Sequence, residues 1–261
     1  MAKISLITVC RNGAHVLRTA LDSVLAQQDA DIEYLVVDGA SSDGTAGLLR
    51  EYEPRFAGRL RWISEPDRGM YDALNKGLRM ATGEIVGILN ADDVLADDRV
   101  LARVASALTP DLDGTYADVR FVRSEPGLSL GELRVASVSR YCSGRNFRPW
   151  MFRFGVQTAH PSTFFRRSCF DRWGEYSLDY GMFGDFELLL RFIWKNRARM
   201  RYLPFCTTVM RLDGASTSGL KSTFKINRAD RRALRDNGCF TSYLLLYARY
   251  PFKVWGFLRR R

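Results

Sequence analysis

The sequence predicts an α/β fold in which a mostly parallel central sheet is flanked by helices and followed by a C-terminal helical appendage. Three observations predict it. Short apolar runs alternate with helical patterns four times in the first 93 residues, as in parallel βαβ units. The chain has 261 residues, 46% of them apolar, which suits one large domain with an appendage. Basic residues concentrate near the C-terminal end.

The elements of the first half follow from local patterns. Apolar runs with β-branched residues predict buried strands, and apolar residues at helical spacing predict helices with one face on the sheet. The helix that starts at Met70 is expected to end at Met80, because Thr82 and Gly83 follow. The expected strands are 3–9, 34–37, 60–64 and 85–89, and the expected helices are 14–27, one through 48–49, and 70–80.

The second half has a different pattern. A strongly apolar helix is expected at 186–194, and a stretch rich in Gly, Arg and aromatic residues predicts a mobile loop at 141–154. The other expected elements are a helix at 100–108 and strands at 115–122, 128–138, 162–166 and 201–209. No repeat or low-complexity linker interrupts the chain. We therefore divide it into a domain at 1–215 and a basic appendage at 216–261.

Two adjacent carboxylates, Asp92 and Asp93, follow the buried run at 85–89 in the sequence Asn90-Ala91-Asp92-Asp93. At the end of a buried strand they repel each other, and desolvation disfavours both charges. A hard divalent cation held by oxygen ligands would relieve this cost. The alternative is that one of the two acids caps the next helix. In an open α/β sheet, ligands bind at the carboxyl ends of the strands, where these acids lie.

Two further acids are expected on the same edge of the sheet, because Asp38 and Asp67 follow the second and third strands. Asp38 could accept a hydrogen bond from a base or ribose, or could form an Asx-turn. The first strand–helix turn, Cys10-Arg11-Asn12-Gly13, lacks both GxGxxG and GxxxxGK[ST], which argues against NAD binding and against a P-loop NTPase. A metal at Asp92 would then neutralise a diphosphate.

Composition limits the classes of protein and of binding partner that fit this sequence. The formal net charge of +10 suits an anionic partner. No apolar run is long enough for a membrane-spanning helix, and the N-terminal residues lack a signal-peptide layout. Five cysteines without CxxC spacing argue against a zinc site and a disulfide framework and favour a reducing cytosol.

Four segments in order carry a family resemblance: ITVCRN, VVDGASSDGT, SEPDRGMYDALNKGLRMATGE and ILNADD. Together they resemble the family 2 glycosyltransferases of GT-A fold, which have a Rossmann-like sheet. The resemblance is close over about the first 95 residues and looser through HPSTFFRR and FGDFELLLR. It implies an inverting glycosyltransferase that uses Mn²⁺ or Mg²⁺. The expected donor is a nucleotide-diphosphate sugar, UDP-linked, and the expected acceptor is a hydroxyl of a glycan or lipid-linked molecule in bacterial surface polysaccharide synthesis.

The resemblance also implies site residues. Asp92 would be the metal ligand, and Asp185 would be the general base that takes the acceptor's proton. The alternative for Asp185 is a helix N-cap, with Asp179 and Glu187 as reserve bases. Two positions depart from the family pattern, because Gly39 and Asn90 stand where acids are usual. The nucleotide-binding residues would be Thr8, Arg11, Asn12, Asp38, Asp67, Gly69, Tyr71, Asn75, Asn90 and Ala91.

Three more residues are candidates for contact with the acceptor or the diphosphate. His160 stands before Pro161, and a buried, hydrogen-bonded histidine is the alternative for it. Arg145 and Arg148 lie in the predicted loop, which could close over the substrate or remain a solvated loop with aromatic anchors.

The C-terminal segment 243–261, YLLLYARYPFKVWGFLRRR, interleaves basic and apolar residues, and the span 221–261 holds eleven basic and two acidic residues. Pro251 forbids one straight helix. Such a segment suits an anionic membrane surface, which predicts a cytoplasmic protein bound peripherally at the inner face of the cell membrane. Packing on the domain or on a partner subunit is the alternative.

Other classes fit the sequence less well. A sugar nucleotidyltransferase would need a Gly-rich, Arg- or Lys-bearing first loop, and a processive synthase would need a QxxRW motif and spanning helices. A nucleic-acid-binding module would explain the charge. However, no nucleic acid is expected, because the positive excess lies beside apolar and aromatic residues.

Overall fold

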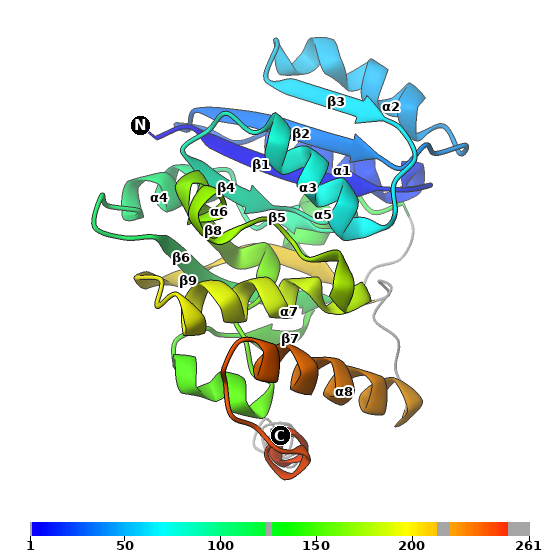
Figure 1. Cartoon of the computed structure of the whole chain (residues 1–261). Coiled ribbons are helices and arrows are strands. Elements are labelled where there is room, and N and C mark those ends of the chain that lie inside the picture. Colours follow the sequence, from blue (N-terminus) through cyan, green and yellow to red (C-terminus); the bar gives the residue numbers. More distant parts are fainter. Residues whose placement is uncertain (1, 124–126, 213–219, 250–261) are drawn as a thin grey trace.

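The computed structural model describes residues 2–123, 127–212 and 220–249. In this part of the chain, one nine-stranded sheet forms the centre, with the strand order β3-β2-β1-β4-β8-β6-β9-β5 and β7 beside β6 (Figure 1). The strands are β1 (Ile4–Cys10), β2 (Ile32–Asp38), β3 (Leu60–Ser64), β4 (Ile85–Ile88), β5 (Val94–Leu95), β6 (Gly114–Val122), β7 (Val138–Cys142), β8 (Thr163–Arg166) and β9 (Met200–Arg211).

The first four strands are parallel, as predicted. Cys10 pairs with Asp38, and Asp38 with Ser64, so the carboxyl ends of β1, β2 and β3 meet at one edge. The connecting helices are α1 (Ala14–Leu25), α2 (Thr45–Tyr52) and α3 (Met70–Met80). The helix predicted at 70–80 is confirmed with the same bounds.

The second half of the sheet is mixed. Strand β8 runs antiparallel to both β4 and β6, β6 is parallel to β9, and β5 is antiparallel to β9. The helices of this half are α4 (Val100–Ala107), α5 (Leu130–Val135), α6 (Arg167–Trp173) and α7 (Gly184–Leu189), which continues into a π-helical turn at Leu190–Lys195. Short 3₁₀ segments lie at Glu53–Phe56, Pro149–Phe154, His160–Ser162 and Leu178–Phe183, the last labelled η4.

One sequence prediction fails in this half, and a second stretch has more structure than predicted. The strand predicted at 128–138 is wrong, because most of this stretch forms α5. Ser129 and Glu132 make a reciprocal capping box that starts the helix, and the strand β7 begins only at Val138. The stretch 141–154, predicted to be a mobile loop, contains the end of β7 and a 3₁₀ segment. Phe147 and Phe152 are buried there, edge to face with ring centroids 5.4 Å apart.

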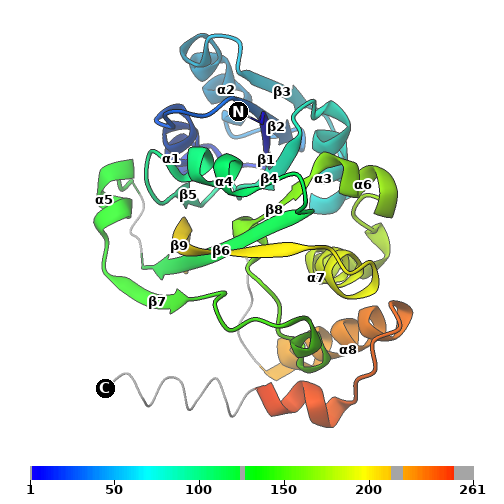
Figure 2. The ribbon, with the colours of Figure 1, turned by 90° about the vertical axis from the view of Figure 1, so that its left-hand side faces the viewer.

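Helices cover both faces of the sheet, with α1 and α4 on one side and α3, α6 and α7 on the other (Figure 2). Because successive side chains of a strand point to opposite faces, Leu6 packs into the core on the first side and Ile7 into the core on the second. Both faces of the parallel strands are therefore buried under helices, which explains their continuous apolar runs.

The C-terminal helix α8 (Leu220–Asp236) lies below α7 in Figure 1 and packs against α7 and η4. Residues 243–249 form a further short helix. Leu234 and Leu246 are buried in the second core, and Arg249 makes a buried ion pair with Asp230 at 2.8 Å. The described part of the predicted appendage thus packs on the domain. Its predicted boundary at 215/216 and its last residues, 250–261, lie outside the described residues. In the described chain, no helix has the length and apolarity to cross a membrane.

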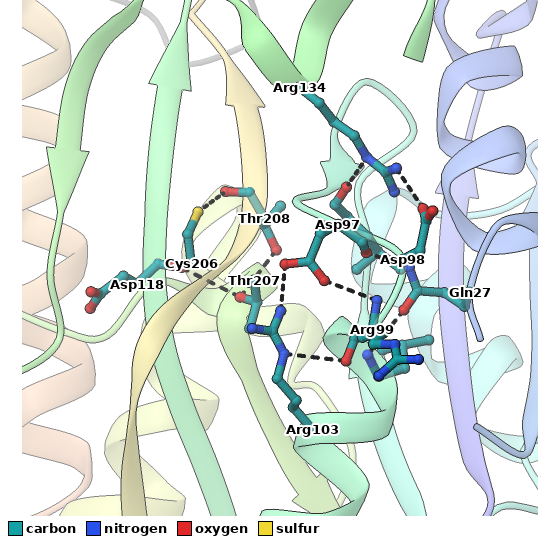
Figure 3. Close-up of polar contacts among 12 residues, drawn as sticks. Gln27, Asp97, Asp98, Arg99, Arg103, Asp118, Arg134, Cys206, Thr207 and Thr208 are labelled. Carbon is teal, nitrogen blue, oxygen red and sulfur yellow. Dashed lines mark hydrogen bonds and ion pairs between the residues drawn. The ribbon is translucent and has the colours of Figure 1, made fainter. Parts of the chain in front are cut away.

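Polar contacts hold the segment that follows the two adjacent acids (Figure 3). The side chain of Gln27 donates to the carbonyl of Asp97 at 2.7 Å and accepts from the amide of Leu101 at 3.0 Å. Arg134 donates to the carbonyl of Leu95 at 3.0 Å and to Asp98 at 2.6 Å. These contacts fix β5 beside β9, and with it the turn at 90–93 against the end of the sheet.

Candidate active site

A cavity of about 1040 Å³ opens at the carboxyl ends of β1 and β4. Its walls also include the starts of α1 and α3, the segment 157–161, the start of α7 and the end of β9. Residues from all parts of the chain thus meet at the edge where the sequence predicts a ligand. Eight of the predicted site residues line it: Arg11, Asn12, Tyr71, Asn90, Ala91, Asp92, His160 and Asp185.

The two adjacent acids have different environments. Both line the cavity, but Asp92 is partly exposed, whereas Asp93 is buried and accepts a hydrogen bond from the Asn90 amide at 2.7 Å. Burial and the neighbouring Asp92 charge raise the pKa of Asp93 well above its usual range. Arg211, at the end of β9, faces both acids from the cavity wall; burial lowers its pKa and the two carboxylates oppose that effect.

The residues present fit a divalent cation that arrives with a ligand. Asp92 offers a hard oxygen donor to the cavity, the donor type that Mg²⁺ and Mn²⁺ prefer. In the described ranges, no group of three His, Cys, Asp or Glu side chains could hold a metal ion. The remaining ligands would therefore come from the phosphates of a bound nucleotide and from water.

Asp185 lies in the first turn of α7 and forms part of the cavity wall. One carboxylate oxygen accepts a hydrogen bond from the Tyr71 hydroxyl at 3.1 Å, and the other accepts from the Gln157 amide at 3.3 Å. The N-cap position of α7 is Phe183, and no side chain caps the helix. The alternative N-cap role of Asp185 is therefore absent, and its carboxylate is held by two cavity residues instead.

An aromatic group stands behind Asp185. The ring of Tyr71 stacks on Tyr176 with centroids 5.5 Å apart, and the Tyr176 hydroxyl lies 2.7 Å from His160 Nε2. Burial, then the charge of Asp185, raises the pKa of Tyr71. Burial lowers the pKa of His160, and Asp185 opposes this shift. His160 therefore lines the cavity, as a residue that contacts a ligand would, and it is also hydrogen-bonded to another side chain, as in the structural alternative.

The acids of the neighbouring strands do not line the cavity. Asp38 is fully buried, and its carboxylate accepts hydrogen bonds from the amide and hydroxyl of Ser41 and, at 2.6 Å, from the hydroxyl of Ser64. The two bonds from Ser41 follow the Asx-turn alternative, and the bond from Ser64 ties Asp38 to β3. Asp67 accepts from the amide of Gly69 at 2.8 Å, and a Cβ atom added at Gly39 would lie 2.5 Å from its Oδ2. Asp67 therefore fills the space next to Gly39, where the family pattern has an acid.

Five other predicted residues also lie away from the cavity wall. Thr8 is buried and donates to the carbonyl of Leu89 at 2.6 Å. The Asn75 amide group bonds the backbone of Tyr176 at 2.8 and 2.9 Å, and so joins α3 to the segment before η4. Gly69 precedes α3 with φ of 116°, in the region that favours glycine. Arg145 and Arg148 are exposed in the turn after β7.

Sequence reasoning missed two polar residues of the cavity, Gln157 and Arg211. Gln157 Oε1 and Arg211 Nε are buried and have no hydrogen-bond partner in the described structure. An unsatisfied buried polar atom is costly, so such atoms in a cavity wall indicate a polar ligand. Gln157 stands three residues before His160, and Arg211 stands two residues after the last predicted strand. Neither position carries a local signal that distinguishes it from a loop residue.

The fold and this site define a glycosyltransferase of GT-A fold, and solved structures of that fold are similar to this one. Staphylococcus aureus TarS 1–349 in complex with UDP-GlcNAc has a TM-score of 0.63 at 15% identity, covering 89% of this chain and 66% of that chain. The mannosyltransferase PcManGT from Pyrobaculum calidifontis, in complex with GDP-Man and Mn²⁺, has a TM-score of 0.58 at 19% identity, covering 98% and 81%. The chain thus spans just under two thirds of the length of that TarS chain.

The chain belongs to glycosyl transferase family 2, whose sequence pattern matches residues 5–174. An uncharacterized glycosyltransferase of Mycobacterium tuberculosis (strain ATCC 25618 / H37Rv) is 32% identical over 190 residues. A PGL/p-HBAD biosynthesis glycosyltransferase of Mycobacterium bovis (strain BCG / Pasteur 1173P2) is 31% identical over 189 residues. Each alignment covers 72% of this chain and 68% of the relative. The family that the sequence motifs resemble is thereby confirmed.

Proposed function

We propose that this protein transfers one sugar, with inversion, from a nucleotide-diphosphate donor to a hydroxyl of a glycan or lipid-linked acceptor in surface polysaccharide synthesis. A UDP-sugar is the expected donor. The observation that carries the proposal is that one cavity brings Asp92, at the end of β4, together with Asp185, at the start of α7. Such a transfer needs one group that neutralises the leaving diphosphate and another that accepts the proton of the acceptor hydroxyl.

The diphosphate of the donor is assigned to the Asp92 end. When bound there, Mn²⁺ or Mg²⁺ supplies positive charge that stabilises the departing diphosphate. Asp92 would hold the cation, with Asp93 and Asn90 fixing the turn behind it. Arg211 faces the same place with a donor nitrogen that lacks a partner among the described residues, which suits a phosphate oxygen.

The proton transfer is assigned to Asp185. The acceptor hydroxyl gives its proton to the carboxylate as its oxygen bonds to the anomeric carbon. The bond from that carbon to the phosphate oxygen breaks on the opposite face, and its electron pair leaves with the nucleotide diphosphate. This single displacement inverts the anomeric configuration. Tyr71 and Gln157 hold the two carboxylate oxygens at fixed positions, so that little reorganisation is needed during the reaction.

The other functional classes have less support. A nucleotidyltransferase would need a Gly-rich, basic loop after β1, and the chain has Cys10-Arg11-Asn12-Gly13 there. The M. bovis relative is named for PGL/p-HBAD biosynthesis, which supports, by similarity, an acceptor with a lipid or glycan part. We further propose that the protein acts in the cytoplasm, peripherally at the inner face of the cell membrane.

The proposal is tested by hydrolysis of a panel of nucleotide sugars with Mn²⁺ or Mg²⁺, because background hydrolysis identifies the donor without the acceptor. One donor should be hydrolysed at least tenfold faster than the rest. Asp185→Asn should reduce transfer to an acceptor by roughly a thousandfold while the donor binds as before. Asp179→Asn, in η4 and outside the cavity wall, is the matched control and should remain active. Normal turnover by Asp185→Asn would exclude this residue as the base.

A further inference from the structure

A second cavity, of about 560 Å³, shares no lining residue with the candidate active site and lies between α8 and the segment 238–243 that follows it. Four arginines of α8 line it, at positions 228, 231, 232 and 235. Their spacing of three and four residues places them on one face of the helix. We call this cavity the arginine cleft. Phe240 and Tyr243, from the turn after α8, complete its wall.

The positive charge of the arginine cleft is only partly neutralised. Asp236 pairs with both Arg232 and Arg235, at 3.6 and 3.1 Å. Arg228 and Arg231 make no ion pair with any other described residue, and the guanidinium of Arg231 lies 4.8 Å from the centre of the Tyr243 ring. Guanidinium groups gathered without acidic partners suit an anion with several oxygens, such as a phosphate.

Apolar side chains stand exposed beside these charges. The side chain of Phe240 is 70% exposed and that of Leu244 is 81% exposed, and Tyr247 is exposed one turn further along. The opposite side of the short helix 243–249 packs on the domain. Leu246 is buried there, and the guanidinium of Arg249 bonds Asp230, Asn227 and the carbonyl of Gly155. This helix therefore cannot rotate its apolar side inward without breaking buried contacts.

From these observations we propose that the arginine cleft seats the phosphate headgroups of an anionic lipid bilayer, with Phe240 and Leu244 inserted among the acyl chains. Cations beside protruding apolar side chains match the interfacial region of a membrane. A nucleic acid would use the arginines and could stack on the aromatic rings, but it would leave Leu244 in water. The inference assigns the bilayer contact to described residues of α8 and its turn rather than to 250–261 alone.

The arginine cleft is connected to the catalytic helix. Arg232 donates to the carbonyl of Asp179 in η4 at 3.1 Å, and the hydroxyl of Tyr180 lies 3.0 Å from Asp236. Since η4 leads directly into α7, a bilayer bound at α8 would lie next to the elements that carry Asp185. Binding of the arginine cleft to a bilayer does not require the proposed function. Only its expected use, which is to bring Asp185 close to a lipid-linked acceptor, rests on the proposed function.

The experiment is flotation of the full chain with vesicles of phosphatidylcholine alone and of phosphatidylcholine with 30% phosphatidylglycerol, at low and high salt. Arg228→Glu with Arg231→Glu should weaken binding to the anionic vesicles at least tenfold. The matched control is Arg50→Glu with Arg55→Glu, the same charge change near α2, which lies at the other end of the molecule from α8 (Figure 1). It should bind nearly as well as the natural chain. Leu244→Ser should weaken binding at both salt concentrations.

Each contrary result has a defined meaning. If the charge-reversed α8 variant floats as well as the natural chain, the contact is elsewhere and the proposal is wrong. Failure of the natural chain to float with anionic vesicles, combined with salt-sensitive binding to single-stranded RNA, would instead favour nucleic acid. Donor hydrolysis is measured on the same preparations. Hydrolysis without vesicle binding rejects this inference and the proposed peripheral membrane location but leaves the proposed sugar transfer standing, whereas vesicle binding without hydrolysis of any donor rejects the proposed sugar transfer alone.

Discussion

The hydroxyl of Tyr71 donates a hydrogen bond to the carboxylate of Asp185 at 3.1 Å, across 114 positions of the chain. It connects the first turn of α3 to the first turn of α7. Tyr71, which sequence comparison suggests as a nucleotide contact, is therefore also a positioning residue for the proposed base. The Gln157 amide donates to the second carboxylate oxygen at 3.3 Å from the segment 157–161.

Tyr71→Phe should lower kcat roughly tenfold and leave the KM for the donor within about twofold, because the carboxylate loses one of its two fixed partners while the ring stays stacked on Tyr176. Steady-state kinetics with a saturating acceptor measure both constants. Tyr34→Phe removes a buried hydroxyl in the other core and is the control for a general loss of stability. Equal changes in kcat in the two variants would mean that Tyr71 has no special role.

Removal of divalent cations should abolish activity, and Asp92→Asn should lower kcat/KM for the donor by roughly a hundredfold or more at saturating Mn²⁺. The physical reason is that both acids line the cavity at the end of β4, but Asp92 is the partly exposed one, while Asp93 is buried and accepts a hydrogen bond from Asn90. Activity is measured after chelation and again after Mn²⁺ is added back. Asp171→Asn, an exposed acid on α6, should change nothing. Full activity of metal-stripped enzyme would contradict the assignment.

Gly39→Ala should raise the KM for the donor about fivefold to tenfold, because the new Cβ atom would lie 2.5 Å from Asp67 Oδ2 and 3.5 Å from the side chain of Arg11. Arg11 lines the cavity, so a shift of this pair changes the donor site. Gly47→Ala on α2 is the matched control, since its Cβ atom would meet nothing within 4 Å. Initial rates at a series of donor concentrations measure the change. An unchanged KM for Gly39→Ala would show that the loop adjusts freely.

Glu33→Gln should reduce the free energy of unfolding at pH 7 by about 3 kcal/mol. Burial opposes ionisation of Glu33, but hydrogen bonds from Ser5, Thr82 and Gly83 outweigh it and lower the pKa to about 2. A pKa that is lowered in the folded state stabilises the fold above the unfolded pKa, near 4.5, and this contribution is lost as the pH falls toward 2.

Urea unfolding of the natural chain and the Glu33→Gln variant measures this difference between pH 7 and pH 3. The gap between the two proteins should narrow as the pH falls below about 4.5. Glu51→Gln, an exposed acid paired with Arg18, is the control and should change stability little. A gap that stays constant with pH would mean that the carboxylate charge is not the source of the stabilisation.

Local patterns were enough to predict most of the first half of the fold. Each parallel strand there is a short apolar run, and each helix has its own apolar stripe and end signals, so Met70–Met80 was found with both bounds. The strand predicted at 128–138 is wrong because the apolar residues of this stretch match either period, and the Ser129–Glu132 capping box starts a helix there. Mixed pairing of β6, β8 and β9 depends on partners distant in sequence, which local patterns do not encode.

The candidate site shows the same division. Asp92 and Asp185 could be named from motif positions, and both line the cavity. The polar partners of these two acids come from other parts of the chain. Gln157 lies in a loop, and Arg211 lies at the end of β9, which pairs with β5. Asp38 looked equivalent to Asp92 in the sequence, but its own loop supplies Ser41 to satisfy its carboxylate.

The sequence alone determined that acids would stand at the carboxyl ends of parallel strands, because strand periodicity and chain order place them at one edge of the sheet. Only the tertiary structure decided which of those acids face the cavity. A carboxylate's orientation depends on the hydrogen-bond donors that packing brings within about 3 Å of it. For Asp38 those donors are Ser41 of its own loop and Ser64 of the adjacent strand β3, and they hold the side chain inward. For Asp185 they come from two distant segments and hold the side chain at the cavity wall.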